Sequence, residues 1–217
     1  MSDFADLRGQ MVRRQIEARG ILDALILDAF REVPREEFVD EEHRQFAYDD
    51  HPLPIEAGQT ISQPYIVALM IEAAAIRLGD SVLEVGAGSG YAAAVISRIA
   101  DRVVAIERHG ELAQIARGRM TRLGYHNVRI LQGDGTRGCP DEAPFDAILA
   151  AASGSHVPKP LLDQLSPGGR LVMPVGDPGW VQELVKVTKR ADGTTSQENL
   201  GGVRFVPLIG EEGWRDD

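Results

Sequence analysis

The sequence predicts an α/β protein built on a doubly wound, mostly parallel sheet. Short apolar runs alternate with stretches of helical character between residues 82 and 175, which is the pattern of repeated strand–helix–strand units. The segments ahead of this region are helical, and those after it alternate like antiparallel strands. We therefore expect a Rossmann-like core with N-terminal helices and a C-terminal antiparallel strand addition.

Helical segments come first along the chain. Three stretches have helical character, namely residues 11–29, 34–39 and 64–78. Gly20 is expected to break the first stretch into two helices, Pro34 to stand in the first turn of the second, and Gly79 to end the third. Between them, residues 51–63 carry two prolines and a glycine, and predict a loop.

The core strands and helices follow in alternation. We expect strands at residues 82–85, 103–106, 128–132, 145–149 and 170–175. Helices are expected at residues 91–100 and 160–165. Beyond them, residues 181–189 alternate like an exposed strand, residues 191–194 predict a hairpin turn, and residues 203–208 are expected to close the sheet.

Length and charge limit the possible organisation and partners. The 217 residues are 43% hydrophobic, enough for one substantial core, so we expect a single domain over residues 1–217. Within it we expect N-terminal helices and a substrate-side loop (1–78), a cofactor-binding core (79–176) and C-terminal strands with a tail (177–217). The formal net charge of −10 argues against nucleic acid as a partner. We expect a monomer.

The sequence also predicts the compartment and the absence of metal. No apolar run approaches the length of a membrane span, and charges are spread along residues 1–19, so we expect no membrane helix, no signal peptide and a cytoplasmic location. The single cysteine, Cys139, has no internal disulfide partner, and the five histidines lack ligand spacing. We expect no metal site.

A glycine turn after the first core strand predicts a nucleotide-cofactor site. Gly86, Gly88 and Gly90 let the backbone turn sharply and approach a ligand closely. The dinucleotide fingerprint requires Gly or Ala at its last position, but Tyr91 stands there. Together with Glu84 just before the turn, this favours a ligand that has no pyrophosphate and a positively charged end. S-adenosylmethionine fits that description.

Acidic residues after three successive strands extend this site. We expect Glu84 to hold the methionyl ammonium through water, Glu107 to accept hydrogen bonds from both ribose hydroxyls, and Asp134 to accept one from the adenine amino group. One glycine motif alone is weak evidence, but the three acids together favour the cofactor site. The alternative is that the glycines only form a structural turn and that Glu84 is a surface acid.

The segment before the first core strand supplies hydroxyl groups. Residues 58–65 open the preceding helix, so the hydroxyls of Thr60 and Ser62 can face the methyl donor. Ser62 followed by a proline-containing first turn is more often an N-cap than a catalytic residue. From this segment alone the cap is the favoured interpretation.

Several segments resemble the protein-L-isoaspartate (D-aspartate) O-methyltransferase family, whose members methylate abnormal aspartyl residues in aged proteins. The resemblance runs nearly end to end and includes GQTISQPYIVALM at residues 58–70, LEVGAGSGY at 83–91 and GDG at 133–135. Further matching segments are residues 33–39, 143–148, 164–171, 174–176 and 205–208. The TISQP segment is the discriminating one, because other methyltransferases that share the glycine turn have no reason to carry it.

The resemblance implies a function and a set of site residues. It implies an S-adenosylmethionine-dependent methyltransferase fold, transfer to the free carboxylate of L-isoaspartyl and D-aspartyl residues in proteins and peptides, and S-adenosyl-L-homocysteine as product. It assigns catalysis to Ser62. It assigns the cofactor contacts to Thr60, Ile61, Ser62, Gly86, Gly88, Ser89, Glu107, Asp134 and Gly135, to which the reasoning from the glycine turn adds Glu84. It assigns contacts with the peptide to Tyr65, Val203, Phe205 and Pro207.

Two departures from the family pattern leave alternatives open. Glu56 stands where the family usually has glycine, which would place a carboxylate near the anionic acceptor and weaken substrate binding. Residues 153–156 replace a proline turn, so a looser loop is expected there. A methyltransferase of the same fold acting on another carboxylate or small molecule is the alternative function. A cofactor-binding protein without catalysis is a further one.

Overall fold

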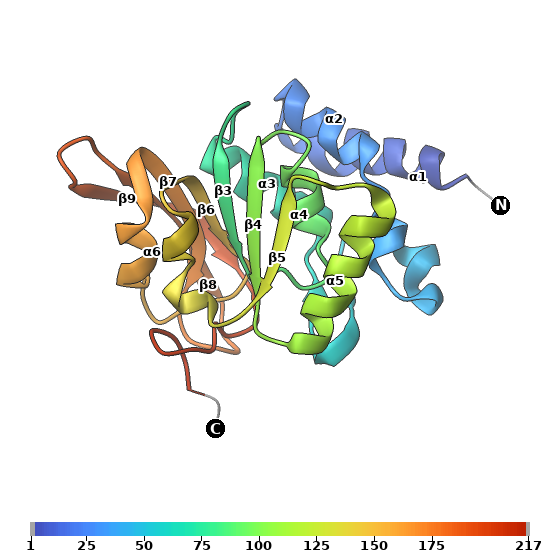
Figure 1. The fold of residues 1–217 in the computed structure, drawn as a ribbon. Helices are drawn as coiled ribbons and strands as arrows, with labels where there is room; N and C mark the ends of the chain where they lie inside the picture. The colour runs from blue at the N-terminus through green and yellow to red at the C-terminus, as the bar shows by residue number, and fades with distance from the viewer. Residues whose placement is uncertain (1–2, 216–217) are drawn as a thin grey trace.

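The centre of the molecule is a seven-stranded sheet with the strand order β5-β4-β3-β6-β7-β8-β9 (Figure 1). The computed structural model describes residues 3–215. Strands β3 to β7 pair in parallel, whereas β8 and β9 join antiparallel at one edge. Their bounds are Ser81–Val85 (β3), Arg102–Glu107 (β4), Val128–Gln132 (β5), Phe145–Ala150 (β6), Leu165–Val175 (β7), Gln182–Lys189 (β8) and Thr195–Val203 (β9). The predicted doubly wound core with an antiparallel addition is confirmed.

Successive residues of the central strands pack into two different hydrophobic clusters. Val82 of β3 belongs to the cluster on one face of the sheet and Leu83 to the cluster on the other. Both are fully buried. Because side chains alternate between the two faces of a strand, an uninterrupted apolar run means that both faces are covered. The apolar character of β3 thus follows from its central place in the sheet.

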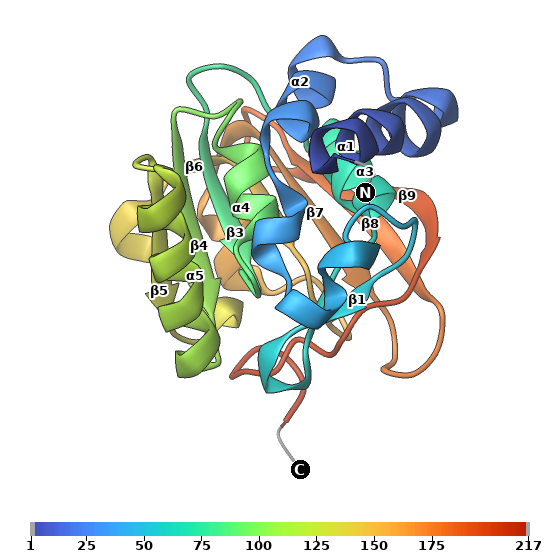
Figure 2. The same ribbon diagram turned by 90° about the vertical axis from the view of Figure 1, so that its right-hand side faces the viewer.

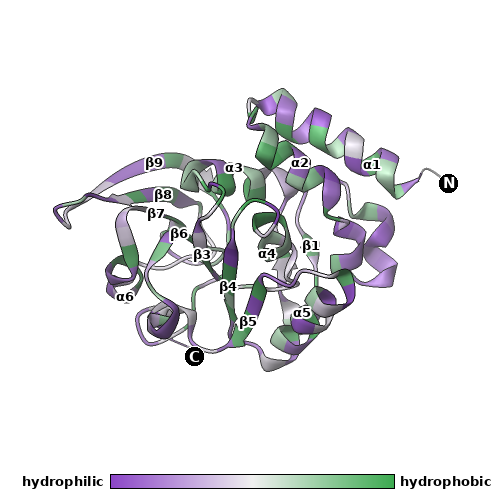
Figure 3. Cartoon of the chain, turned by 45° about the horizontal axis from the view of Figure 1, so that its top comes forward, coloured by the Kyte–Doolittle hydropathy of each residue, from purple (hydrophilic) through white to green (hydrophobic). Residues whose placement is uncertain are grey.

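Helices cover both faces of the sheet. Helices α3 (Pro64–Ala74), α4 (Tyr91–Ile96) and α5 (Gly110–Leu123) lie on one face, and α6 (Lys159–Asp163) lies on the other (Figure 1). The N-terminal helix α2 (Ala24–Glu32) packs over α3 and α4, and α1 (Phe4–Met11) packs against α2 (Figure 2). Figure 3 shows that α4 is largely hydrophobic, in agreement with its burial between sheet and N-terminal helices. Within residues 3–215, no helix combines the length and apolarity needed to span a bilayer.

The N-terminal helices differ in their limits from the prediction. The break at Gly20 is confirmed, since this residue is left-handed with φ of 96°, but α1 begins well before residue 11. The helix expected to end at Gly79 ends at Ala75, with φ of 49°. Arg170 of β7 donates to the carbonyls of Ala74 and Ala75 at 2.7 and 2.6 Å, so the last carbonyls of α3 find their partner in the sheet.

The expected loop at residues 51–63 contains a small hairpin. Strands β1 (Leu53–Pro54) and β2 (Thr60–Ile61) pair antiparallel around a short 3₁₀ turn, η5 (Glu56–Gly58). The stretch beginning at Pro34 is a 3₁₀ helix, η3 (Arg35–Phe38), rather than an α-helix. Both elements are too short for hydrophobic periodicity to identify them.

The strand expected at residues 203–208 is wrong. The last strand, β9, ends at Val203, and the chain then leaves the ladder. The amide of Phe205 donates to the Gln182 side chain at 2.9 Å, and the carbonyl of Val206 accepts from the amide of Ser153 at 2.8 Å. Residues 204–208 therefore cross the carboxyl end of β6 instead of extending the sheet.

Candidate active site

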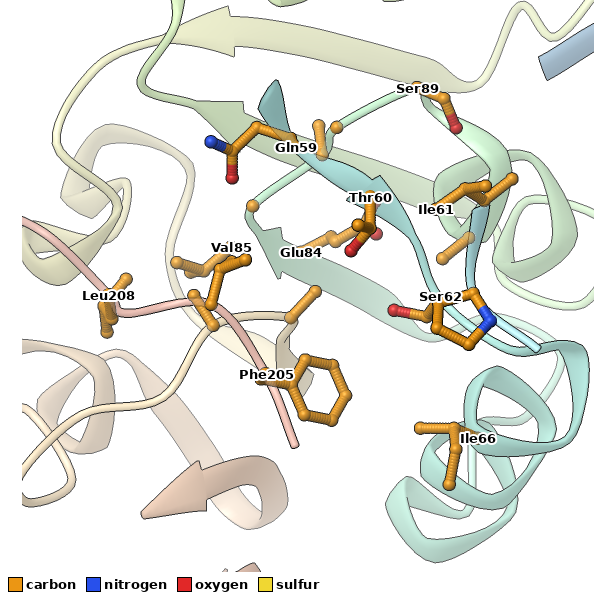
Figure 4. A pocket seen from close by; sticks show the side chains of 18 of the residues that line it. Gln59, Thr60, Ile61, Ser62, Ile66, Glu84, Val85, Ser89, Phe205 and Leu208 are labelled. Atoms are coloured by element: carbon orange, nitrogen blue, oxygen red, sulfur yellow. The ribbon is translucent and has the colours of Figure 1, made fainter. Parts of the chain in front are cut away.

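A cavity of about 990 Å³ opens at the carboxyl ends of β3, β4 and β6 (Figure 4). In open α/β sheets, ligands bind at this edge. The glycine turn after β3 forms its floor, the β1–β2 hairpin and the start of α3 form one wall, and residues 203–209 form another. Most of the predicted site residues line it, namely Thr60, Ile61, Ser62, Glu84, Gly86, Gly88, Ser89, Glu107, Gly135, Val203, Phe205 and Pro207.

The glycine turn is fixed by the neighbouring strand. The amides of Gly86 and Ala87 both donate to the carbonyl of Ile106, at 2.8 and 3.0 Å. Gly90 has φ of 88°, and a Cβ there would lie 2.8 Å from Cε of Met120. The flexible end of Met120 could move aside, but the left-handed φ of residue 90 would strain any side chain there, so the turn requires glycine at this residue.

Glu84 is a buried carboxyl group beside the cavity. Its residue is 2% exposed, and Oε2 has no hydrogen-bond partner among the described residues. Burial raises the pKa of Glu84 well above its ordinary value, and the nearby charge of Glu107 raises this pKa further. A buried carboxyl with one oxygen free of hydrogen bonds, at a ligand cavity, fits a ligand that brings a positive charge. It excludes the alternative that Glu84 is a surface acid.

Glu107 is held in place by two main-chain amides. Its Oε2 accepts from the amide of Gly88 at 2.8 Å, and its Oε1 accepts from the amide of His109 at 2.9 Å. These contacts lock the carboxylate against the glycine turn. Since each oxygen has a second lone pair, the carboxylate can still accept from a ligand diol.

Asp134 lies away from the main cavity. Its Oδ1 accepts from the amide and the hydroxyl of Thr136 at 2.9 and 2.7 Å, and its Oδ2 accepts from the amide of Glu211 at 2.8 Å. Burial acts to raise its pKa, but these hydrogen bonds outweigh it and the net shift is downward. Only Gly135 of this pair lines the cavity. The C-terminal segment thus already binds the Asp134 carboxylate through the amide of Glu211. No sequence pattern predicted this contact between Asp134 and Glu211.

Ser62 directs its hydroxyl into the cavity (Figure 4). The N-cap of α3 is Gln63, and no side chain makes a capping hydrogen bond there. The interpretation of Ser62 as the helix cap is therefore wrong, and its hydroxyl is available to a ligand. Thr60 and Ile61 reach the same cavity from β2 (Figure 4).

Two residues expected near the acceptor lie elsewhere. Tyr65 is not among the residues that line the cavity, and its ring packs under the guanidinium of Arg19 at 4.6 Å. Glu56 also lies outside the lining and pairs with Arg119 at 2.9 Å. The carboxylate of Glu56 is thus neutralised by α5 rather than directed at an anionic substrate.

The loop at residues 153–156 is held tightly at its first residue. Ser153 is fully buried. Its amide donates to the carbonyl of Val206, and its carbonyl accepts from the amide of Leu208, each at 2.8 Å. The indole of Trp214 donates to the same carbonyl at 2.9 Å. The expected looseness is wrong at Ser153, because the segment that crosses β6 binds it on both sides.

Several cavity residues were not predicted from the sequence. They come from the loop after β6, the β1–β2 hairpin, the loop before β8 and the last extended segment, and include Gln59, Ala151, Ala152, Val181 and Arg204. Apart from Gln59, which lies in the segment at residues 58–70, these residues belong to no motif that the sequence analysis identified. Among the residues that the structure describes, no group of three or more His, Cys, Asp or Glu side chains could hold a metal ion.

This fold and cavity define a class of enzyme: methyltransferases that take their methyl group from S-adenosylmethionine. Sequence comparison then identifies the family. The profile of the family described as protein-L-isoaspartate(D-aspartate) O-methyltransferase matches residues 7–213. The chain belongs to this family, and S-adenosylmethionine is its methyl donor.

Relatives and solved structures agree with this assignment. The chain is 55% identical over 204 residues to protein-L-isoaspartate O-methyltransferase 2 of Pelobacter propionicus, covering 94% of this chain and 91% of the relative. It is 56% identical over 213 residues to protein-L-isoaspartate O-methyltransferase 1 of Rhodopseudomonas palustris, covering 98% of this chain and 87% of the relative.

A solved protein-L-isoaspartate O-methyltransferase superposes with a TM-score of 0.87 at 32% identity, covering 95% of this chain and 67% of that one. A second structure, from Plasmodium falciparum, is described as a protein-L-isoaspartate O-methyltransferase in complex with S-adenosyl-L-homocysteine. It superposes with a TM-score of 0.80 at 26% identity, covering 93% of this chain and 98% of that one.

Proposed function

We propose that this chain transfers a methyl group from S-adenosylmethionine to the free carboxylate of L-isoaspartyl residues, and of D-aspartyl residues, in damaged proteins and peptides. The observation that carries the proposal is the placement of the Ser62 hydroxyl in one cavity with the buried Glu84 and the extended wall at residues 203–208. Family membership supports the same acceptor.

The chain's residues fit this cofactor. When bound, S-adenosylmethionine supplies an electrophilic methyl group on a positively charged sulfur. Glu84 would hold the amino-acid end, because its buried carboxyl lacks a cationic partner. The glycine turn at residues 86–90 leaves room for the methionine part, and the carboxylate of Glu107, fixed by two amides, would accept from the ribose hydroxyls. Gly135 would lie against the adenine, with Asp134 shaping this edge through the C-terminal segment.

The acceptor needs orientation rather than activation. A terminal-type carboxylate has a pKa of roughly 3.3 to 3.9, so it is ionised at neutral pH and needs no general base. Ser62 would donate a hydrogen bond to one carboxylate oxygen and leave the other free to attack. Because the charges of nucleophile and methyl donor cancel in the transition state, an enclosed apolar wall such as Val203 and Phe205 favours the reaction over water.

The peptide on either side of the acceptor would lie along residues 203–208. This segment is extended and sits at the mouth of the cavity, which suits main-chain contacts with an extended peptide. Phe205 and Pro207 would contact the substrate there. We also propose that the chain acts as a cytoplasmic monomer without nucleic acid, and the net charge of −10 argues against nucleic acid as a partner.

One assay tests the cofactor and the acceptor together. Labelled S-adenosylmethionine is offered with two synthetic peptides that differ only in one residue, isoaspartyl in one and L-aspartyl in the other. We expect methylation of the isoaspartyl peptide alone. Transfer to neither peptide, with S-adenosyl-L-homocysteine binding intact, would instead indicate another acceptor or a binding role.

A further inference from the structure

Arg35 is a charged residue buried completely between the N-terminal segment and the cavity wall. It opens the 3₁₀ helix η3 and has no exposed surface. Its Nε donates to the carbonyl of Ala47 at 2.8 Å, and its Nη2 donates to the carbonyl of Ser62 at 2.8 Å. Arg35 therefore holds the main chain of the residue whose hydroxyl enters the cavity.

The same guanidinium also contacts the glycine turn. Its Cζ lies 4.7 Å from the centre of the Tyr91 ring, a distance that allows a cation–π interaction. Tyr91 is the first residue of α4, directly after Gly90, and its ring packs edge-on against Phe38 with a centroid distance of 5.5 Å. This contact gives a physical role to the tyrosine that departs from the dinucleotide fingerprint. Arg35 bridges the Ser62 segment and the glycine turn.

Stability alone does not account for this arrangement. Burial lowers the pKa of Arg35, and Nη1 has no hydrogen-bond partner among the described residues. A buried charge with an unused donor contributes little net stability, and replacing such groups by apolar ones is often neutral or stabilising. The guanidinium does fix the geometry of its neighbours. It is planar and rigid, and it donates to two main-chain carbonyls while its face packs against the Tyr91 ring.

We propose that Arg35 is a positioning residue for methyl transfer, which sets the place of Ser62 relative to the glycine turn through the Ser62 carbonyl and the Tyr91 ring. This inference rests on the proposed function, because it requires that the position of the Ser62 hydroxyl matters for the rate. A displacement of about 1 Å at a reacting centre can cost about 100-fold in rate. Lysine at residue 35 retains the charge but cannot reach both carbonyls with one amine in the same geometry.

A double-mutant cycle on the full chain tests the proposal. Arg35→Lys, Ser62→Ala and the double variant are assayed for kcat with the isoaspartyl peptide and for S-adenosyl-L-homocysteine affinity. We expect Arg35→Lys to lower kcat roughly tenfold or more when Ser62 is present, but less than about threefold in the Ser62→Ala background, because residues that act through one another are not additive. Cofactor affinity should stay within about twofold in each variant, which also reports that the variant is folded.

Arg170→Lys is the matched control. Arg170 also donates to two main-chain carbonyls of α3, but at the opposite end of the helix and outside the cavity lining. We expect this variant to lower the melting temperature with kcat unchanged. Arg35→Met serves as a second variant, since an apolar residue of similar length tests whether the rate loss persists without a buried charge.

The outcomes distinguish the positioning role of Arg35 from the proposed methyltransferase function. An equal loss of kcat from Arg35→Lys with and without Ser62 would overturn the positioning role, as would an unchanged kcat in Arg35→Lys or a Ser62→Ala variant with full activity. An equal loss of cofactor affinity and kcat would mean that Arg35 only maintains the fold. If the unmodified chain methylates neither peptide, the proposed function fails, and this role for Arg35 fails with it.

Discussion

The guanidinium of Arg119 donates to the carboxylate of Glu56 over 2.9 Å and thereby ties α5 to the hairpin that leads to Ser62. A second nitrogen of Arg119 donates to the carbonyl of Ser89 at 3.4 Å. Glu56 therefore joins a bridge between the β1–β2 hairpin and the glycine turn. Its charge is compensated before any substrate arrives.

This bridge predicts that Glu56→Ala affects stability more than substrate binding. Both side chains are largely buried, at 20% and 10% exposure, so removing the acid leaves Arg119 with an unmet charge. We expect the free energy of unfolding to fall by about 1–3 kcal/mol, with KM for the isoaspartyl peptide unchanged. Urea denaturation and steady-state kinetics measure the two effects.

The exposed pair of Lys159 and Asp163 is the control for Glu56. Its side chains are 80% and 61% exposed, so Asp163→Ala should cost less than about 1 kcal/mol. A Glu56→Ala variant that bound peptide several times more tightly would contradict the prediction and would indicate that Glu56 acts on the acceptor after all.

Ser62→Ala should lower kcat and leave cofactor affinity intact. A hydrogen bond to a charged group contributes about 1.5–3 kcal/mol, which corresponds to a loss of roughly 10- to 100-fold in rate. Calorimetric titration with S-adenosyl-L-homocysteine gives the affinity, and methyl transfer to the isoaspartyl peptide gives the rate. Ser155, an exposed serine outside the cavity lining, provides the control variant Ser155→Ala. Equal loss of affinity and rate in Ser62→Ala would point to a structural role.

Cofactor binding should release a proton from Glu84. The raised pKa means that this carboxyl retains its proton in the folded chain at a pH where the unfolded chain has lost it. A ligand ammonium favours the charged form and lowers that pKa on binding. Titration with S-adenosyl-L-homocysteine in buffers of different ionisation enthalpy measures the release, and Glu84→Gln should abolish it and weaken binding.

The same carboxyl should make the ligand-free chain less stable as pH rises. Since the folded pKa exceeds the unfolded one, folding takes up a proton, so the contribution of Glu84 is full below the ordinary carboxyl range and is lost as pH rises through the raised pKa. Glu84→Gln should flatten this part of the profile of melting temperature against pH. An unchanged profile would show that Glu84 is already charged in the ligand-free chain.

Gly135→Ala should destabilise the chain, whereas Gly118→Ala should stabilise it. A Cβ at Gly135 would lie 2.5 Å from Cγ1 of the buried Val85, while a Cβ at Gly118 on the exposed face of α5 would meet no atom within 4 Å. We expect a loss of about 1–3 kcal/mol at Gly135 and a gain of about 0.5–1 kcal/mol at Gly118. Urea denaturation of both variants measures these changes in the free energy of unfolding. A stabilised Gly135→Ala variant would show that the cavity lining beside Gly135 can move.

Long periodic segments and motifs of the fold could be predicted from the sequence. The apolar runs of β3, β4 and β6 identify buried parallel strands, because a residue covered on both faces must be apolar wherever it points. The glycine turn and the acids at the ends of β3 and β4 could likewise be predicted, since a sharp turn requires glycine and a cofactor requires polar groups at fixed places.

Other features depend on contacts between residues that are far apart in the sequence, and local sequence patterns do not predict such contacts. The end of α3 is set by Arg170, far away in the sequence. The exit of the chain from the sheet after Val203 depends on its bonds with Ser153 and Gln182, and the carboxylate of Asp134 is occupied by an amide 77 residues away. Arg35 lies in a motif that supports the resemblance, but only the structure places it behind Ser62.

The segment that crosses the carboxyl end of β6 has a consequence for biosynthesis. Ribosomes make the β1–β2 hairpin and the glycine turn before residues 204–208, and these later residues bind Ser153, just after β6, and Gln182 of β8. A chain still being translated thus lacks the wall against which a peptide would lie. Stalled chains ending before residue 203 should accordingly transfer no methyl group, so the enzyme becomes competent only after residues 204–208 have been made.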